Sequence, residues 1–101
     1  MKVNIGIFSL GVILLTGCTK TPTPCFSADN GSAAKVNEEV QFDPSCSKDA
    51  TSYFWDFGDG TSTYGNPVMH KYANTGVYMV KLTASNSKKS ASVIQNVAVN
   101  P

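Results

Sequence analysis

The chain has 101 residues, of which 42% are hydrophobic and 10% aromatic, so it has room for a single domain and is too apolar for an intrinsically disordered protein. The formal net charge is +1, and Lys88 and Lys89 are the only adjacent basic residues. Because polyanion binding usually needs clustered Lys and Arg, we expect no nucleic-acid partner.

Residues 1–17 have the features of an export signal. Lys2 supplies a positive charge, and an apolar run of 11 residues follows from Ile5, whereas a membrane-spanning helix needs about 20. The run ends in the sequence LTGC, which resembles the lipobox of bacterial lipoproteins, where the thiol of the final Cys takes the diacylglycerol. We therefore expect cleavage after residue 17 and lipidation of Cys18. The alternative is an ordinary signal peptide that leaves Cys18 as a free thiol.

Residues 18–24 are predicted to be the lipidated Cys and a tether. The sequence Thr-Lys-Thr-Pro-Thr-Pro of residues 19–24 cannot pack a core, and its prolines favour extended conformations. Acyl chains on Cys18 would anchor the protein to a membrane, at about 0.8 kcal/mol per buried methylene. By analogy with lipoprotein sorting, Thr19 in place of Asp favours the outer membrane. The expected location is thus the cell envelope, on a periplasmic or surface-facing side.

Cys25 and Cys46 form an even pair in a chain routed to an oxidising compartment, which predicts a disulfide. If residues 25–29 and 38–45 are neighbouring antiparallel strands, Cys25 opposite Cys46 centres their connection inside the predicted loop. A disulfide closing a loop of about 22 residues contributes around 3 kcal/mol. The alternatives are two free thiols or a metal pair, although the chain has one histidine and no CxxC sequence.

Residues 25–101 alternate in hydrophobicity with a period of two and show no sustained helical spacing, which predicts an all-β domain. We expect an immunoglobulin-like sandwich of about seven antiparallel strands. Three runs have inward-facing positions of one parity: Val36, Val40 and Phe42; Tyr53, Trp55 and Phe57; Tyr78, Val80, Leu82 and Ala84. A further short run lies near residues 68–72. In the last run, residues 90–99, Gln95 interrupts the parity of its apolar neighbours, which predicts a bulge near Ile94.

The run WDFGDG and the aromatic and glycine positions after it resemble a polycystic kidney disease (PKD) domain over about residues 25–99. The matching positions are Trp55, Asp56, Phe57, Gly58, Asp59, Gly60, His70, Tyr72, Gly76 and Tyr78. Trp55 can fill the centre of a sandwich, Gly58 and Gly60 permit positive φ, and Asp59 can accept backbone N–H bonds. Tyr78 fits either a tyrosine corner or plain core. The motif is therefore interpreted as a folding device.

The same residues have chemical alternatives. Some PKD-like modules bind calcium, and Asp56 and Asp59 could share a Ca²⁺ with backbone carbonyls, but the run lacks the D-x-D-x-D-G spacing of a calcium loop. His70 could act as a general base, yet no Ser, Cys or paired acid accompanies it at interpretable spacing. We therefore expect no catalytic residue, no cofactor and no metal.

The resemblance implies an interaction or spacer module at the cell envelope that contacts another protein. The alternative is polysaccharide binding, for which Tyr64 and Phe54 are the candidate stacking aromatics. Because Trp55 points inward, Phe54 must point outward, and by the same alternation so must Met79. We expect Phe54 and Met79 to lie side by side as an exposed interaction patch.

Overall fold

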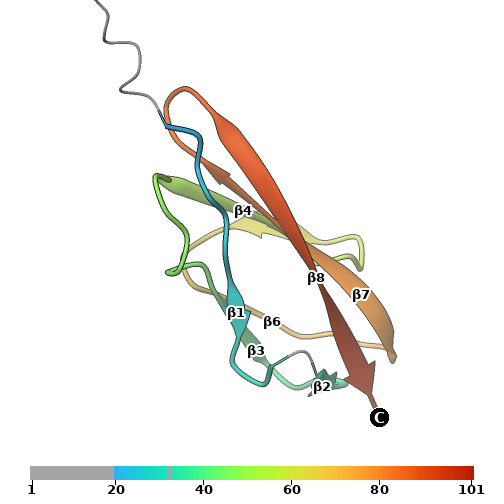
Figure 1. Ribbon diagram of the computed structural model, residues 1–101. Helices are drawn as coiled ribbons and strands as arrows, with labels where there is room; N and C mark the ends of the chain where they lie inside the picture. The colour runs from blue at the N-terminus through green and yellow to red at the C-terminus, as the bar shows by residue number, and fades with distance from the viewer. Residues whose placement is uncertain (1–19, 32) are drawn as a thin grey trace, which may run out of the picture.

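The structure is a computed structural model that describes residues 20–31 and 33–101 (Figure 1). Its elements are β1 Ser27–Ala28, β2 Ala33–Lys35, β3 Val40–Asp43, β4 Ser52–Asp56, β5 Ser62–Tyr64, β6 Val68–His70, β7 Gly76–Ser85 and β8 Ser90–Asn100. One sheet has the order β1-β3-β6 and the other the order β2-β8-β7-β4-β5. The predicted all-β sandwich is confirmed. The described residues form eight strands, where about seven were expected, and β2 pairs with β8 in parallel, whereas only antiparallel pairs were expected.

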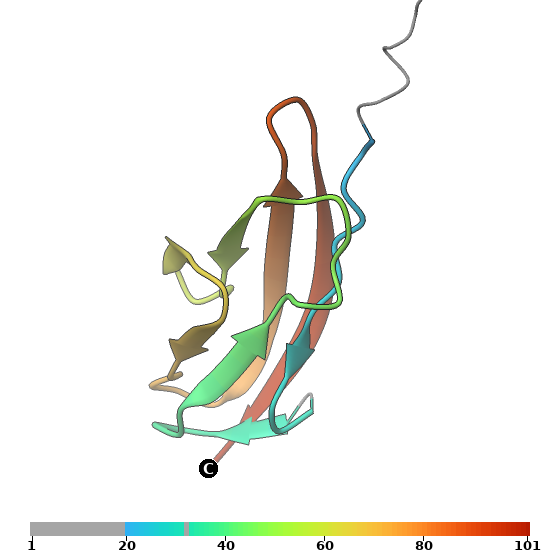
Figure 2. The same cartoon turned by 90° about the vertical axis from the view of Figure 1, so that its left-hand side faces the viewer.

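The β7–β8 hairpin runs the length of the domain (Figures 1 and 2). Its register is uninterrupted from Gly76 opposite Val99 to Ser85 opposite Ser90. The described chain starts beside the turn of this hairpin, whereas its C-terminus lies at the opposite end, next to β2 (Figure 1). The domain is therefore elongated, with its two termini at opposite ends.

The core is an aromatic cluster between the two sheets. Trp55 and Phe42 are fully buried and their ring centroids lie 5.7 Å apart. Phe26 contacts Trp55 edge-on at 5.1 Å, and Phe57 lies 5.5 Å from Phe42. The indole Nε1–H of Trp55 donates to the carbonyl of Gly65 at 2.9 Å, which satisfies the one polar group of the buried ring. Most of the predicted inward positions in or next to β3, β4 and β7 are buried: Val40, Phe42, Trp55, Phe57, Val80, Leu82 and Ala84. The other three, Val36, Tyr53 and Tyr78, are partly buried and pack against the core.

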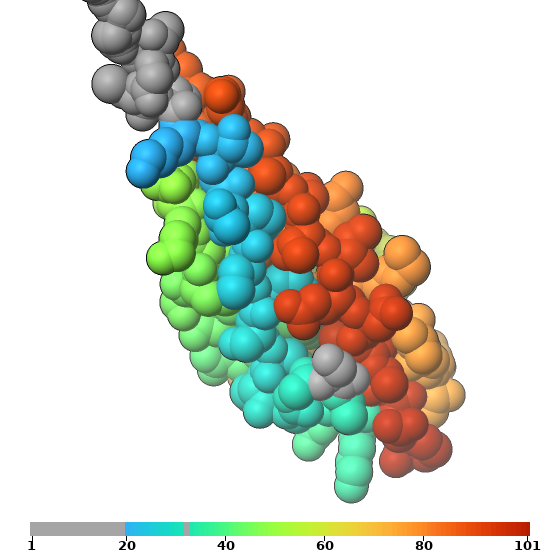
Figure 3. All heavy atoms as spheres, viewed as in Figure 1, coloured from blue at the N-terminus to red at the C-terminus, as the bar shows by residue number. Residues whose placement is uncertain are grey.

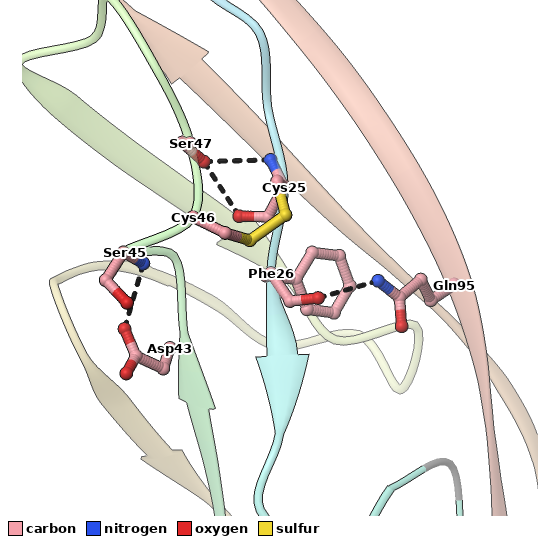
Figure 4. The surroundings of a disulfide bond; sticks show 7 residues. All are labelled: Cys25, Phe26, Asp43, Ser45, Cys46, Ser47 and Gln95. Atoms are coloured by element: carbon pink, nitrogen blue, oxygen red, sulfur yellow. Dashed lines mark hydrogen bonds between the residues drawn. A yellow bond between two sulfur atoms is a disulfide. The ribbon is translucent and has the colours of Figure 1, made fainter.

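The bulge predicted near Ile94 is absent, because the β7–β8 register is continuous through it. Gln95 keeps the inward parity of its strand and donates from Nε2 to the carbonyl of Phe26 at 2.8 Å (Figure 4). Ile94 is 50% exposed on the outer face. The prediction was wrong because a polar side chain can occupy an inward position when it satisfies a backbone group of the facing sheet.

Residues 20–24 pack against the domain, which corrects the free tether expected there (Figure 3). Pro22 is buried, and Thr23 exchanges two backbone hydrogen bonds with Lys48 at 2.9 and 3.0 Å. The carbonyl of Lys20 accepts a hydrogen bond from the side-chain amide of Asn86 at 2.8 Å. The segment therefore extends the edge of the domain, because its backbone groups find partners across that edge.

The predicted disulfide between Cys25 and Cys46 is confirmed, with a Cα–Cα distance of 5.3 Å (Figure 4). Ser47 supports it, because its hydroxyl accepts from the backbone N–H of Cys25 at 2.8 Å and donates to the carbonyl of Cys25 at 2.7 Å. The bond thus ties the segment before β1 to the loop that follows β3.

Candidate functional site

The WDFGDG segment is a tight turn that each aspartate stabilises locally. The Oδ1 atom of Asp56 accepts from the backbone N–H of Gly58 at 3.1 Å. Asp59 does the same for the N–H of Thr61 at 3.1 Å and also accepts from the Thr61 hydroxyl. Gly58 and Gly60 have φ values of +83° and +92°, as expected from the sequence. Both aspartates therefore act in the turn itself.

His70 links this turn to the other sheet. Its Nε2 lies 2.8 Å from Oδ2 of Asp59, and its ring stacks on Phe57 with centroids 4.0 Å apart. Both side chains of the pair are shielded, at 16% exposure for His70 and 20% for Asp59. Burial raises the pKa of the Asp59 carboxyl, but hydrogen bonds from Thr61 and His70 outweigh it, so the pKa lies below its ordinary value. The contact joins β6 to the loop after β4 and thereby holds the two sheets together.

Two tyrosines complete the same side of the core. The buried hydroxyl of Tyr72 donates to the carbonyl of Phe57 at 2.9 Å, and the ring of Tyr72 stacks on Tyr78 at 4.3 Å. Burial, reinforced by the charge of Asp59, raises the pKa of Tyr72 well above its ordinary value, so its hydroxyl remains a donor. Tyr78 donates to the carbonyl of Asn74 at 2.8 Å, four residues upstream, as in a tyrosine corner.

Asp56 and Asp59, the two residues weighed as calcium ligands, both accept hydrogen bonds from protein groups. Asp59 uses both carboxylate oxygens for Thr61 and His70, and Asp56 directs Oδ1 into its own turn. Within residues 20–31 and 33–101, no three His, Cys, Asp or Glu side chains are grouped so that they could hold a metal ion.

The outer face of the five-stranded sheet carries exposed apolar side chains. Val77 is 69% exposed, Met79 59% and Ile94 50%. Val77 and Met79 lie on one face of β7, and Ile94 lies diagonally across from Met79 on β8, whose residue opposite Met79 is Asn96. We call Val77, Met79 and Ile94 the β7–β8 patch.

Phe54 is not part of this patch, which corrects the expected Phe54–Met79 pair. The register places Phe54 opposite Thr83, whereas Met79 lies four residues from Thr83 along β7, beside Gly58 in the turn after β4. At about 3.3 Å per residue the two positions are separated by about 13 Å. Phe54 is half-buried against Tyr64, with ring centroids 4.7 Å apart.

Tyr64 borders a hollow at the β4–β5 edge of the same sheet. The side chain is 71% exposed, and the hollow has a volume of about 200 Å³. Its lining combines an aromatic platform with hydroxyl and amide groups, from Thr51, Ser52, Tyr53, Tyr64, Gly65 and Asn66. The sequence indicated Tyr64 as a candidate ligand-binding residue but not Tyr53 or Asn66. These three residues are brought together only by the pairing of β4 with β5.

The sequence of residues 21–100 matches the family described as PKD domain. This chain belongs to the PKD domain family. Over 72 residues it is 40% identical to Collagenase ColA of Clostridium perfringens, a match covering 67% of this chain and 6% of that protein. Collagenase ColA of Bacillus cereus is 47% identical over 58 residues, a match that covers 52% of this chain and 6% of that protein. The chain thus matches only a small segment of these relatives.

Solved structures agree with this PKD fold. The PKD1 domain of the Vibrio cholerae metalloprotease PrtV is 26% identical with a TM-score of 0.68, covering 81% of this chain and all of that one. A second similar structure comes from a study of promiscuous carbohydrate-binding modules of the β-sandwich superfamily. It is 29% identical with a TM-score of 0.77, and the match covers 81% of this chain and 35% of that one. A PKD domain by itself is a non-catalytic module.

The expected signal peptide and Cys18 lie outside the described residues. Within the part of the chain that the structure describes, no helix is long and apolar enough to cross a membrane.

Proposed function

We propose that this PKD domain is a lipid-anchored extracytoplasmic interaction module that binds a protein partner through the β7–β8 patch. The observation that carries the proposal is the exposure of Val77, Met79 and Ile94 on the outer face of a sheet whose other face forms the core. Large exposed apolar side chains that lie together are typical of interaction surfaces. The anchor is supported by the LTGC sequence, and the location by the export signal before it.

Collagen is the first protein ligand to test, because the two relatives compared above are named collagenases. The triple variant Val77→Thr/Met79→Thr/Ile94→Thr should fold normally and lose the retention that the wild-type protein shows on immobilised collagen. Met69→Thr is a matched control, because Met69 is 50% exposed on the other sheet. Equal retention of the triple variant and wild type would exclude the patch as the binding surface.

The anchor is tested separately in cells. Metabolic labelling with a palmitate analogue should mark the wild-type chain and not Cys18→Ser. Equal labelling of both proteins would exclude Cys18 as the lipidation site.

Polysaccharide binding is a second candidate, favoured by the hollow beside Tyr64. An exposed aromatic ring next to hydroxyl and amide groups suits stacking and hydrogen bonding to a sugar, and the similar structure from the carbohydrate-binding study shares the fold. Tyr64→Ala should abolish retardation on polysaccharide affinity gels with little change in stability, because the side chain is 71% exposed. Retardation that Tyr64→Ala leaves unchanged, or none for the wild type, would exclude this function.

A further inference from the structure

Four lysines lie at the end of the domain where the described chain begins. Lys88 and Lys89 are in the β7–β8 turn, Lys48 pairs with the N-terminal segment, and Lys20 is the first residue described. All four are exposed. The single ion pair among the described residues is the one between His70 and Asp59, so none of these four lysines is ion-paired with a described acidic side chain. We call Lys20, Lys48, Lys88 and Lys89 the lysine end.

Asn86 holds the lysine end together. Its side-chain amide donates to the carbonyl of Lys20 at 2.8 Å and to that of Asp49 at 3.0 Å. Its side-chain oxygen accepts from the backbone N–H groups of Lys88 and Lys89, both at 2.9 Å. Three separate segments therefore meet at one residue, and the clustering of the lysines is a property of the fold.

The charge of the domain is strongly asymmetric. The lysine end and the adjacent Asp49 together have four lysines and one acidic residue, whereas the rest of the chain after Lys2 has three lysines and six acidic residues. The two parts therefore carry formal charges of +3 and −3 at neutral pH. Glu38 and Glu39 follow β2, which lies at the end of the domain opposite the β7–β8 turn (Figure 1). The domain is therefore positive at one end although its net charge is near zero.

We infer that the lysine end docks on anionic lipid headgroups of the membrane that holds Cys18. The inference rests on the proposed lipidation. Cys18 precedes Lys20 by two residues, which span at most about 7 Å when fully extended. That distance is within the Debye length of about 8 Å at physiological ionic strength, so Lys20 would lie within range of the charge of the membrane surface, and Asn86 holds the segments of the other three lysines beside it. Each lysine near an anionic surface strengthens partitioning by about fivefold.

Docking in this way gives the module an orientation. The patch residues Val77 and Met79 are near the start of β7, which pairs with the last residues of β8 at the C-terminal end of the domain. The lysine end would therefore face the headgroups, while Val77 and Met79 would lie toward the end of the domain that is far from the membrane. The short connection to Cys18 and the docked lysines together would hold the domain upright.

The orientation is tested with a chemically attached anchor, so that the result does not depend on lipidation in cells. All eight strands and the disulfide lie within residues 20–101, so a protein starting at Cys18 keeps the whole fold. Its Cys18 thiol is coupled to a maleimide lipid in vesicles of phosphatidylglycerol and phosphatidylcholine in equal parts, or of phosphatidylcholine alone. Acetylation of each lysine is then followed by mass spectrometry. Lys48, Lys88 and Lys89 should react about fivefold more slowly on the anionic vesicles, and high salt should remove the difference.

A matched pair of variants separates position from net charge. In the unanchored Cys18→Ser protein, Lys48→Gln/Lys88→Gln/Lys89→Gln should lower partitioning to the anionic vesicles on the order of 100-fold. The control Lys35→Gln/Lys71→Gln/Lys81→Gln removes the same charge elsewhere and should retain most of the binding.

Equal losses in the two variants, or equal acetylation rates on both vesicle types, would overturn the inference. Soluble polyphosphate provides a further control. If it slows acetylation of the lysine end as strongly as the anionic vesicles do, the inference is overturned, since the site would then recognise phosphate rather than a membrane surface.

Discussion

Replacing Gly58 by alanine tests the closest backbone contact of the WDFGDG turn. A Cβ at Gly58 would lie 2.7 Å from the carbonyl oxygen of Met79 and 3.0 Å from its nitrogen. These atoms belong to β7, which is paired on both sides with β4 and β8, so they cannot move away freely. A left-handed backbone costs an L-residue about 1–2 kcal/mol, and overpacking adds about 1–3 kcal/mol. The smaller entropy of the unfolded alanine chain offsets about 0.4–1 kcal/mol, so we expect a net loss of about 2–4 kcal/mol.

Gly60→Ala is the matched control for this experiment. Gly60 has a similar φ of +92°, but its added Cβ would meet no atom within 4 Å. It should therefore lose only about 1 kcal/mol from backbone strain. Urea unfolding followed by the fluorescence of Trp55, the single tryptophan, measures both variants. If the two variants are equally destabilised, the turn does not pack against β7 as closely as the structure indicates.

Three further predictions concern the core and its supports. Replacing both Cys25 and Cys46 by alanine should lower the free energy of unfolding by about 3 kcal/mol, and two alkylatable thiols in the native wild-type protein would contradict the disulfide. Because the pKa of Asp59 is lowered in the folded state, its stabilising contribution is complete above the ordinary Asp pKa of about 4 and is lost as the pH falls through the folded value. The urea midpoint of the wild type should therefore fall on acidification, and that of Asp59→Asn should fall less steeply. Parallel plots of midpoint against pH for the two proteins would refute this. Trp55→Ala should cost about 3–5 kcal/mol and largely prevent folding, as circular dichroism would show, whereas a well-folded variant would mean that the core is misassigned.

Alternation in the sequence was enough to predict which side of each main strand is buried. It placed Phe42, Trp55 and Leu82 inward, and all three are fully buried. A period of two fixes the face of a side chain but not its position along the neighbouring strand. For that reason Phe54 and Met79 were correctly predicted to lie on one face and wrongly predicted to be neighbours.

Contacts between segments distant in sequence could not be predicted from local pattern. Gln95 bonds the carbonyl of Phe26, 69 residues earlier, and no pattern around Gln95 indicates that partner. The parallel strand β2 is a three-residue segment that pairs with the last residues of β8. The same limitation hid the lysine end, because only Lys88 and Lys89 are adjacent in the sequence.

The parallel pairing of β2 with the end of β8 determines how the domain would respond to mechanical force. A pull between Lys20 and Pro101 would be shared between the disulfide and β2, because β2 lies inside the loop that Cys25 and Cys46 close, and the part that reaches β2 would load its pairing with the end of β8 in shear. The disulfide would also withhold the 21 positions from Cys25 to Cys46 from extension, about 70 Å of chain that cannot lengthen. Anchored at one end and loaded at the other, the domain would act as a stiff link of nearly constant length.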